Sequence, residues 1–151
     1  MPDAQLTGEK PTIELILAFD FGLRWVGVAV GQSLTATARP LTTLTAKQGK
    51  LQQAELDALV REWQPNALAV GLPLNMDDSE SAMSTRSRRF ARYLAKTTKL
   101  PTYLVDERLT SRTADSIQEK GRESATGPGN HAHAAALIAM SFLNDASHEA
   151  V

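Results

Sequence analysis

The acidic residue Asp20 is the first side chain in the sequence whose position suggests chemistry. It directly follows the apolar residues 15–19, which are typical of a buried strand, and it precedes Phe21 and Gly22. A carboxylate in this place lies at the carboxyl edge of the sheet, where open α/β folds bind ligands. The alternative is structural, because an Asp shortly before a glycine also forms ordinary turns. The Asp-x-Gly spacing alone leaves both interpretations open.

A second acidic position is the pair Asp106 and Glu107, which ends the apolar run 102–105. If this strand runs parallel to the first, the pair reaches the same edge as Asp20. Alternate residues of a strand point to opposite faces, so only one of the two acids can face the same site as Asp20. The structural alternative is that the pair caps the following helix or bonds Arg108.

Carboxylates that converge on one sheet edge imply a cation. Two such groups repel each other unless a positive charge neutralises them. Mg²⁺ suits this place because it takes oxygen ligands and keeps positions for water and phosphate. Two metal ions about 4 Å apart would activate a water and stabilise the leaving oxygen in phosphodiester hydrolysis. The acidic residues therefore predict a divalent metal site that acts on phosphate.

A basic helix face is the third candidate. The spacing predicts a helix over residues 79–97, whose apolar stripe includes Met83, Phe90 and Leu94. Four cations lie opposite that stripe: Arg88, Arg92, Lys96 and Lys99. No acidic residue occurs in residues 84–99, which is unusual in a chain of net charge −1. This pattern predicts contact with a phosphate backbone, and the alternative is an ordinary solvated face.

The elements that position these side chains alternate along the chain. Strands are predicted at 15–20, 25–31, 35–45, 67–71 and 102–105, and helices at 50–63, 79–97, 111–120 and 131–143. Short links make the first three strands an antiparallel meander, and the two strands that follow helices lie parallel to the first. Pro40 marks an edge or a bulge. The predicted fold class is α/β, a five-stranded mixed sheet flanked by helices.

Composition limits the organisation and the partners. The 151 residues suit one domain, predicted at 13–145 between a mobile N-terminal tail at 1–12 and a C-terminal tail at 146–151. The absence of cysteine excludes disulfides and thiolate metal sites, and no apolar run is long enough to cross a membrane. We therefore expect a cytoplasmic protein with no membrane partner, as a monomer or weak homodimer. The net charge places any nucleic-acid contact on a local patch.

Several separate motifs resemble the YqgF (RuvX) family. They are LAFDFG at 17–22, VGVAVG at 26–31, TARPL at 37–41, EWQP at 62–65, VGLPLNMD at 70–77 and DERLT at 106–110. The resemblance covers residues 15–143, and its several parts make it more specific than any single motif. It implies an RNase H-like fold related to Holliday-junction resolvases. It also implies a bacterial cytoplasmic nuclease that matures the 5′ end of pre-16S ribosomal RNA.

The resemblance also assigns the catalytic and metal-binding residues. The acidic residues of the family carry over to Asp20 and Glu107. A third acid normally opens the last helix in a pattern like Asp-x-x-Ala-Ala, and here residues 131–135 read HAHAA, so His131 takes its place. Spacing alone would make His131 a capping or hydrogen-bonded histidine at a helix start. A site of two acids and an imidazole should hold Mg²⁺ weakly and accept Mn²⁺ more readily.

Four functions remain open on this basis. The first is a metal-dependent endonuclease that processes pre-16S rRNA. The second is a non-catalytic ribosome-associated or nucleic-acid-binding factor that keeps the nuclease fold, which the missing third carboxylate favours. The third is a Holliday-junction resolvase acting on branched DNA. The fourth is an actin-like or sugar-kinase-like phosphotransferase, which would need a second domain and a second phosphate loop that 151 residues leave no room for.

Overall fold

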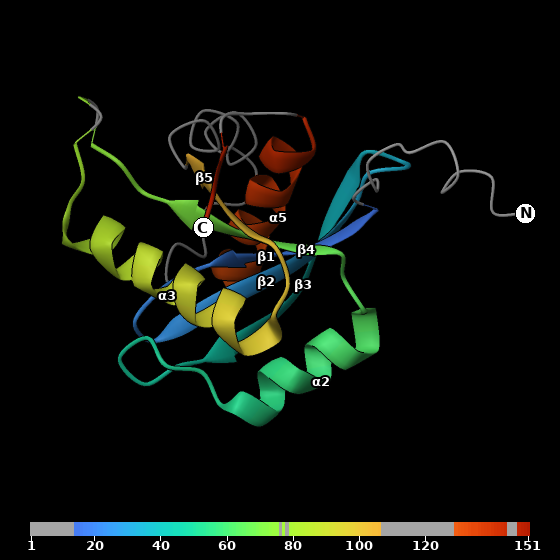
Figure 1. The fold of residues 1–151 in the computed structure, drawn as a ribbon, viewed down its shortest axis with the longest axis horizontal. Coiled ribbons are helices and arrows are strands. Elements are labelled where there is room, and N and C mark those ends of the chain that lie inside the picture. The colour runs from blue at the N-terminus through green and yellow to red at the C-terminus, as the bar shows by residue number, and fades with distance from the viewer. Residues whose placement is uncertain (1–13, 76, 78, 107–128, 145–147) are drawn as a thin grey trace, which may run out of the picture.

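The core of the molecule is a mixed sheet, seen in a computed structural model that describes residues 14–75, 77, 79–106, 129–144 and 148–151 (Figure 1). The six described strands lie in the order β3-β2-β1-β4-β5-β6. Their bounds are β1 Leu15–Asp20, β2 Trp25–Gln32, β3 Thr37–Thr45, β4 Ala67–Leu72, β5 Thr102–Asp106 and β6 His148–Ala150. The predicted antiparallel meander of β1, β2 and β3 is confirmed, as are the parallel pairings of β4 with β1 and of β5 with β4.

The two edges of the sheet differ from its centre. Pro40 lies in the edge strand β3, beside a register shift in which Val28 pairs with Thr42 and Ala29 pairs with Pro40, so both predictions for this proline are confirmed. The sheet has one strand more than predicted, because β6 pairs antiparallel with β5 at the other edge. Its three residues lie within the segment 146–151 that we predicted as a tail, and they are too few to show a strand period.

Three described helices cover the sheet: α2 (Gln53–Trp63), α3 (Ala82–Thr98) and α5 (Gly129–Leu143). α2 and α3 pack on one face and α5 on the other (Figure 1). The predicted helix 111–120 lies outside the described residues. None of the helices in the described part of the chain combines the length and apolar character needed to span a bilayer.

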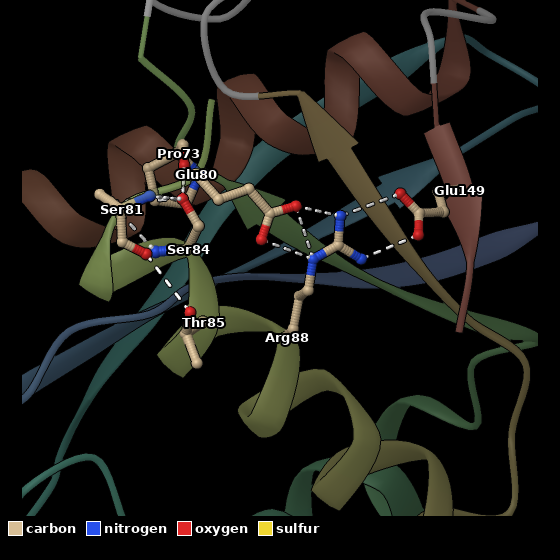
Figure 2. Close-up of polar contacts among 7 residues, drawn as sticks. All are labelled: Pro73, Glu80, Ser81, Ser84, Thr85, Arg88 and Glu149. Atoms are coloured by element: carbon tan, nitrogen blue, oxygen red, sulfur yellow. Dashed lines mark hydrogen bonds and ion pairs between the residues drawn. The ribbon is translucent and has the colours of Figure 1, made fainter. Parts of the chain in front are cut away.

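The start of α3 is fixed to the end of β4. Ser81 is the N-cap and accepts a hydrogen bond from the Ser84 backbone N–H, while the Ser84 hydroxyl accepts one from the Ser81 N–H. The same Ser84 hydroxyl donates to the Pro73 carbonyl just after β4 (Figure 2). α3 therefore begins at the carboxyl edge of the sheet, two to three residues later than the sequence pattern predicted, because the capping box sets its first turn.

The end of β1 presents side chains to both layers. Leu17 and Phe19 belong to the core under α2 and α3, whereas Ile16 and Ala18 belong to the core under α5. The same alternation directs Asp20 toward the α5 layer. The next residue, Phe21, contacts Phe90 of α3 with ring centroids 4.9 Å apart. Two neighbouring residues at one strand end therefore face opposite layers.

Candidate metal site and basic face

Asp20 and His131 meet at the carboxyl edge of the sheet. Asp20 is the last residue of β1, and its Oδ2 lies 3.5 Å from Nδ1 of His131 in the first turn of α5. The side chains are 17% and 28% exposed, so both remain accessible from solvent. The two residues are 111 positions apart in sequence and come together only through the fold.

The close approach of α5 to β2 brings His131 to Asp20. Gly27 is the β2 partner of Asp20 in the antiparallel register. A Cβ added to Gly27 would lie only 1.9 Å from the backbone oxygen of His131. Only a glycine leaves room for the first turn of α5 at this point. Gly27 lies within the motif at residues 26–31, but its role in the site could not be predicted because it depends on how α5 crosses the strand.

α5 turns the face that carries His131 toward the sheet. His131 shares its helix face with Ala135, Ile138 and Phe142, and these three are buried against the sheet. His133, two residues along, is exposed. His131 is the third residue of α5 as the structure describes this helix, from Gly129.

Of the neighbouring acids Asp106 and Glu107, the structure describes only the first. Asp106 ends β5, pairs with Leu72 and follows the alternation of Leu104, which packs in the core under α2 and α3. Its side chain position is therefore on the face opposite to that of Asp20. Glu107 lies outside the described residues, so its part in the site stays a prediction.

The donor set of the described residues accounts for part of a metal site. No group of three His, Asp or Glu residues with metal-binding geometry occurs among them. A carboxylate oxygen and an imidazole nitrogen 3.5 Å apart are close to the roughly 3 Å that separates neighbouring ligands bound at about 2.1 Å to one octahedral ion. Asp20 and His131 thus fit as two ligands, and a further carboxylate is needed to complete the set.

On the basic helix, Arg88 is held between two carboxylates (Figure 2). Its guanidinium lies 2.6 Å from Glu80 and 2.8 Å from Glu149 of β6, and its side chain is only 27% exposed. Hydrogen bonds to Glu80 and Glu149 raise the pKa of Arg88 above its ordinary value. The same contact lowers the pKa of Glu80. Arg88 therefore joins α3 to β6 in this conformation.

The rest of the basic face is open to solvent. Arg92, Lys96 and Lys99 are exposed, as predicted from the helical period. Arg86 and Arg89, which were not among the predicted contacts, are also exposed. The signal for these two was present, because they lie in the same acid-free stretch of the chain. We call the exposed cations of α3 and its C-cap the α3 basic face: Arg86, Arg89, Arg92, Lys96 and Lys99.

The architecture is the RNase H-like fold, as predicted. One similar solved structure is described as "T. thermophilus RuvC in complex with Holliday junction substrate", with a TM-score of 0.57 and 16% sequence identity; the match covers 87% of this chain and 94% of that chain. Another is the yeast mitochondrial Holliday junction resolvase, with a TM-score of 0.52 and 10% identity over 91% of this chain and 81% of that one. At these identities the likeness concerns the fold alone.

The sequence comparison is more specific. The family model RuvX, described as Holliday junction resolvase, matches residues 14–145, and the chain belongs to this family. A relative from Acinetobacter baylyi is 48% identical over 113 residues, which are 72% of this chain and 77% of the relative. One from Pseudomonas fluorescens is 43% identical over 141 residues, 88% of this chain and 94% of the relative. Both relatives are named "Putative pre-16S rRNA nuclease".

Proposed function

We propose that this chain is a metal-dependent endonuclease that cleaves phosphodiester bonds in pre-16S ribosomal RNA. The observation that carries the proposal is the contact between Asp20 and His131 at the carboxyl edge of an RNase H-like sheet. The names of relatives at 43–48% identity support the substrate. The likeness to RuvC supports the fold only, so a branched DNA substrate is an alternative that the experiment must separate.

Asp20, His131 and Glu107 would hold the divalent cation. The first two present their donor atoms to one another, and strand alternation beyond Val105, which packs under α5, supports Glu107 as the acid on the same face. A bound cation would supply an activated water and neutralise charge that develops on the phosphate. Asp20 would hold the cation at the end of β1, and the close approach of α5 at Gly27 fixes His131 relative to Asp20.

The α3 basic face would contact the substrate backbone. The helix that carries these cations starts beside the end of β4, at the same edge of the sheet as Asp20. Phosphate contacts from Lys and Arg give affinity without reading sequence, which suits a structured RNA. Arg88 was predicted to join these contacts. To do so it would exchange Glu80 or Glu149 for a phosphate.

The decisive experiment measures cleavage of a pre-16S rRNA fragment, with a four-way DNA junction as a parallel substrate, in Mg²⁺ and in Mn²⁺. Asp20→Asn and Glu107→Gln should each lower the cleavage rate at least 100-fold, the typical effect of removing a group that stabilises the transition state. Glu62→Gln removes an exposed acid of α2 and serves as the matched control. Wild-type rates in both site variants would refute the assigned site.

A non-catalytic role in ribosome assembly is the second candidate, and His131 is the observation that favours it. Replacing an acid by an imidazole removes one negative charge from the cation site. If purified protein binds the RNA fragment tightly but cleaves neither substrate with either metal ion, the binding role replaces the nuclease. Cleavage of the DNA junction alone would instead assign a resolvase.

A further inference from the structure

A cavity of about 420 Å³ lies on the α3 side of the sheet, directly behind the end of β1. It is lined by Phe21, by the turn at residues 48–51, and by α3 through Phe90 and Tyr93. Its volume falls within the roughly 300–1,000 Å³ of pockets that bind small molecules. Phe21 follows Asp20 in sequence, and the two side chains face opposite layers, so the cavity and the candidate metal site lie on opposite faces of the sheet at the end of the same strand.

The floor of the cavity is aromatic. Phe90 is almost fully buried and stands between Phe21 and Tyr93, at centroid distances of 4.9 and 6.4 Å. Phe21 and Tyr93 are only partly buried, so they offer ring surface to an occupant. The Tyr93 hydroxyl donates to Oε1 of Gln53 at the start of α2, which holds the ring in place. Flat apolar rings that face solvent are stacking platforms.

The wall opposite α3 is a rigid turn. Lys47 and Lys50 exchange backbone hydrogen bonds of 3.0 Å in both directions, and Gln48 and Gly49 between them have positive φ values of 52° and 85°. The Gly49 N–H donates to the Leu23 carbonyl at 3.0 Å. This geometry is that of a tight type I′ turn. The cavity is thus built by residues that hydrogen bonds hold in position before any ligand arrives.

The rim of the cavity is positively charged. Lys50, Arg86 and Arg89 line it, and no acidic residue does so in the described part of the chain. None of these three cations makes an ion pair with another described residue. Arg88, which lies on α3 like Arg86 and Arg89, makes two. Aromatic rings surrounded by unneutralised cations complement a base with phosphates on either side.

We infer that this cavity holds one unpaired base of the strand that passes the Asp20 site. The base stacks on Phe21 and Tyr93, and Lys50, Arg86 and Arg89 contact the phosphates that flank it. A base within a duplex has both faces covered by its neighbours and could not enter. This role rests on the proposed nuclease function for the identity of the strand, and it makes the enzyme selective for cleavage next to an unpaired nucleotide.

The test measures binding rather than cleavage. Wild-type protein in EDTA is titrated with a short single-stranded RNA and with copies that carry one abasic site at successive positions. An abasic site at the held position should weaken binding about tenfold, within the range of a lost base–aromatic stack. A blunt duplex of equal length should bind more weakly than the single strand, and polyglutamate should not compete at equal charge.

Tyr93→Leu keeps an apolar side chain but removes the ring. It should weaken binding of the intact strand about tenfold and lose its sensitivity to the abasic site. Tyr103→Leu is the matched control, because the Tyr103 ring packs against Phe142 on the α5 side of the sheet, with centroids 5.2 Å apart. It should keep the full abasic effect.

Three results would overturn the inference. The first two are an abasic scan that is flat in the wild-type protein and an abasic effect that survives in Tyr93→Leu. Equal competition by polyglutamate would also overturn it and assign the cavity to acidic peptides. The scan needs no variant, so a folding defect in Tyr93→Leu cannot hide the answer. A protein that fails to cleave but shows the abasic effect would refute the nuclease and keep the base pocket.

Discussion

An imidazole at position 131 sets the charge of the candidate metal site. His131 faces Asp20 across 3.5 Å and brings a nitrogen donor without a negative charge. Mg²⁺ binds oxygen in preference to nitrogen, whereas Mn²⁺ accepts imidazole more readily. If His131 is a ligand, as we propose, the identity of this one side chain should set which ion the site prefers.

Changing His131→Asp should raise the affinity for Mg²⁺ relative to Mn²⁺ by about tenfold, comparable to the smaller effects of altering a metal ligand's surroundings. The affinities are measured by calorimetric titration of the full chain. His133→Asp provides the control, because it adds the same charge at an exposed position of the same helix turn. Equal shifts in the two variants would show that His131 does not contact the ion.

The sequence predicted some of these residues better than others. Asp20 could be placed because a strand followed by an acid and a glycine is a local pattern. The sequence could not say which of Asp106 and Glu107 faces the same layer as Asp20. The structure puts Asp106 on the face of the sheet opposite to that of Asp20. The pairing of Arg88 with Glu149 could not be predicted, because 61 residues separate the partners and only β6 brings them together.

At the scale of elements, the crossing of α5 over β2 depends on glycine. A Cβ on Gly27 would overlap the backbone of α5, with 1.9 Å to the His131 oxygen and 2.6 Å to the Ala132 nitrogen. A Cβ on Gly31 would meet only side-chain atoms at 3.2–3.3 Å, which can yield by a few tenths of an ångström. The two glycines of one strand thus make a matched pair.

Gly27→Ala should destabilise the fold by about 3 kcal/mol or more, at the upper end of overpacking effects, because the helix backbone itself must move. It should also weaken metal binding, since His131 moves with the helix. Gly31→Ala should cost about 1 kcal/mol or less. Urea unfolding and metal titration measure the two effects, and similar losses in both variants would contradict the geometry.

The junction of α3 with β6 depends on ionic contacts. Glu149→Gln removes one partner of Arg88 and should cost less than about 1 kcal/mol overall, as expected for a partly exposed pair. The effect on the local stability of the β6 pairing should be larger. The Val151 N–H, which donates to the Thr102 carbonyl at 2.9 Å, should exchange faster with deuterium. Unchanged exchange at β6 would mean that backbone pairing alone holds this strand.

This junction should also respond to acid. Arg88 lowers the folded-state pKa of Glu80 below its ordinary 4.5. The contribution of the pair is therefore fully present above pH 4.5 and is lost as the pH falls through the lowered folded-state value. Glu80→Gln should flatten the loss of stability in that acid range.

At the scale of the whole molecule, the α3 basic face should govern the salt dependence of binding. Each phosphate that a cation neutralises contributes about −0.7 to −0.9 to the slope of log affinity against log salt. Arg92→Ala combined with Lys96→Ala should therefore reduce the steepness by up to about 1.8. Arg61→Ala on the exposed side of α2 is the control. An unchanged slope would return these residues to an ordinary solvated face.

The overall architecture was accessible from the sequence because its signals are local and repeated. Apolar runs predicted the five longer strands. The lengths of the links between them predicted which strands pair antiparallel and which pair parallel. β6 was not predicted, because three residues are too few to show the strand period and its partner β5 lies more than 40 positions earlier. The cavity near the end of β1 was not predicted either. Its walls are Phe21, the turn at residues 47–50 and α3, and these meet only in the folded chain.

The two ends of the described sheet also limit how it can grow. An exposed strand offers free backbone groups to which another chain can add, which makes it a route to aggregation. One edge strand, β3, contains Pro40, which has no backbone N–H, and a register shift, so another strand could not pair regularly along it. The other, β6, offers only three residues. Strand addition is therefore disfavoured at both edges, and association between copies of this chain should proceed through side-chain surfaces instead.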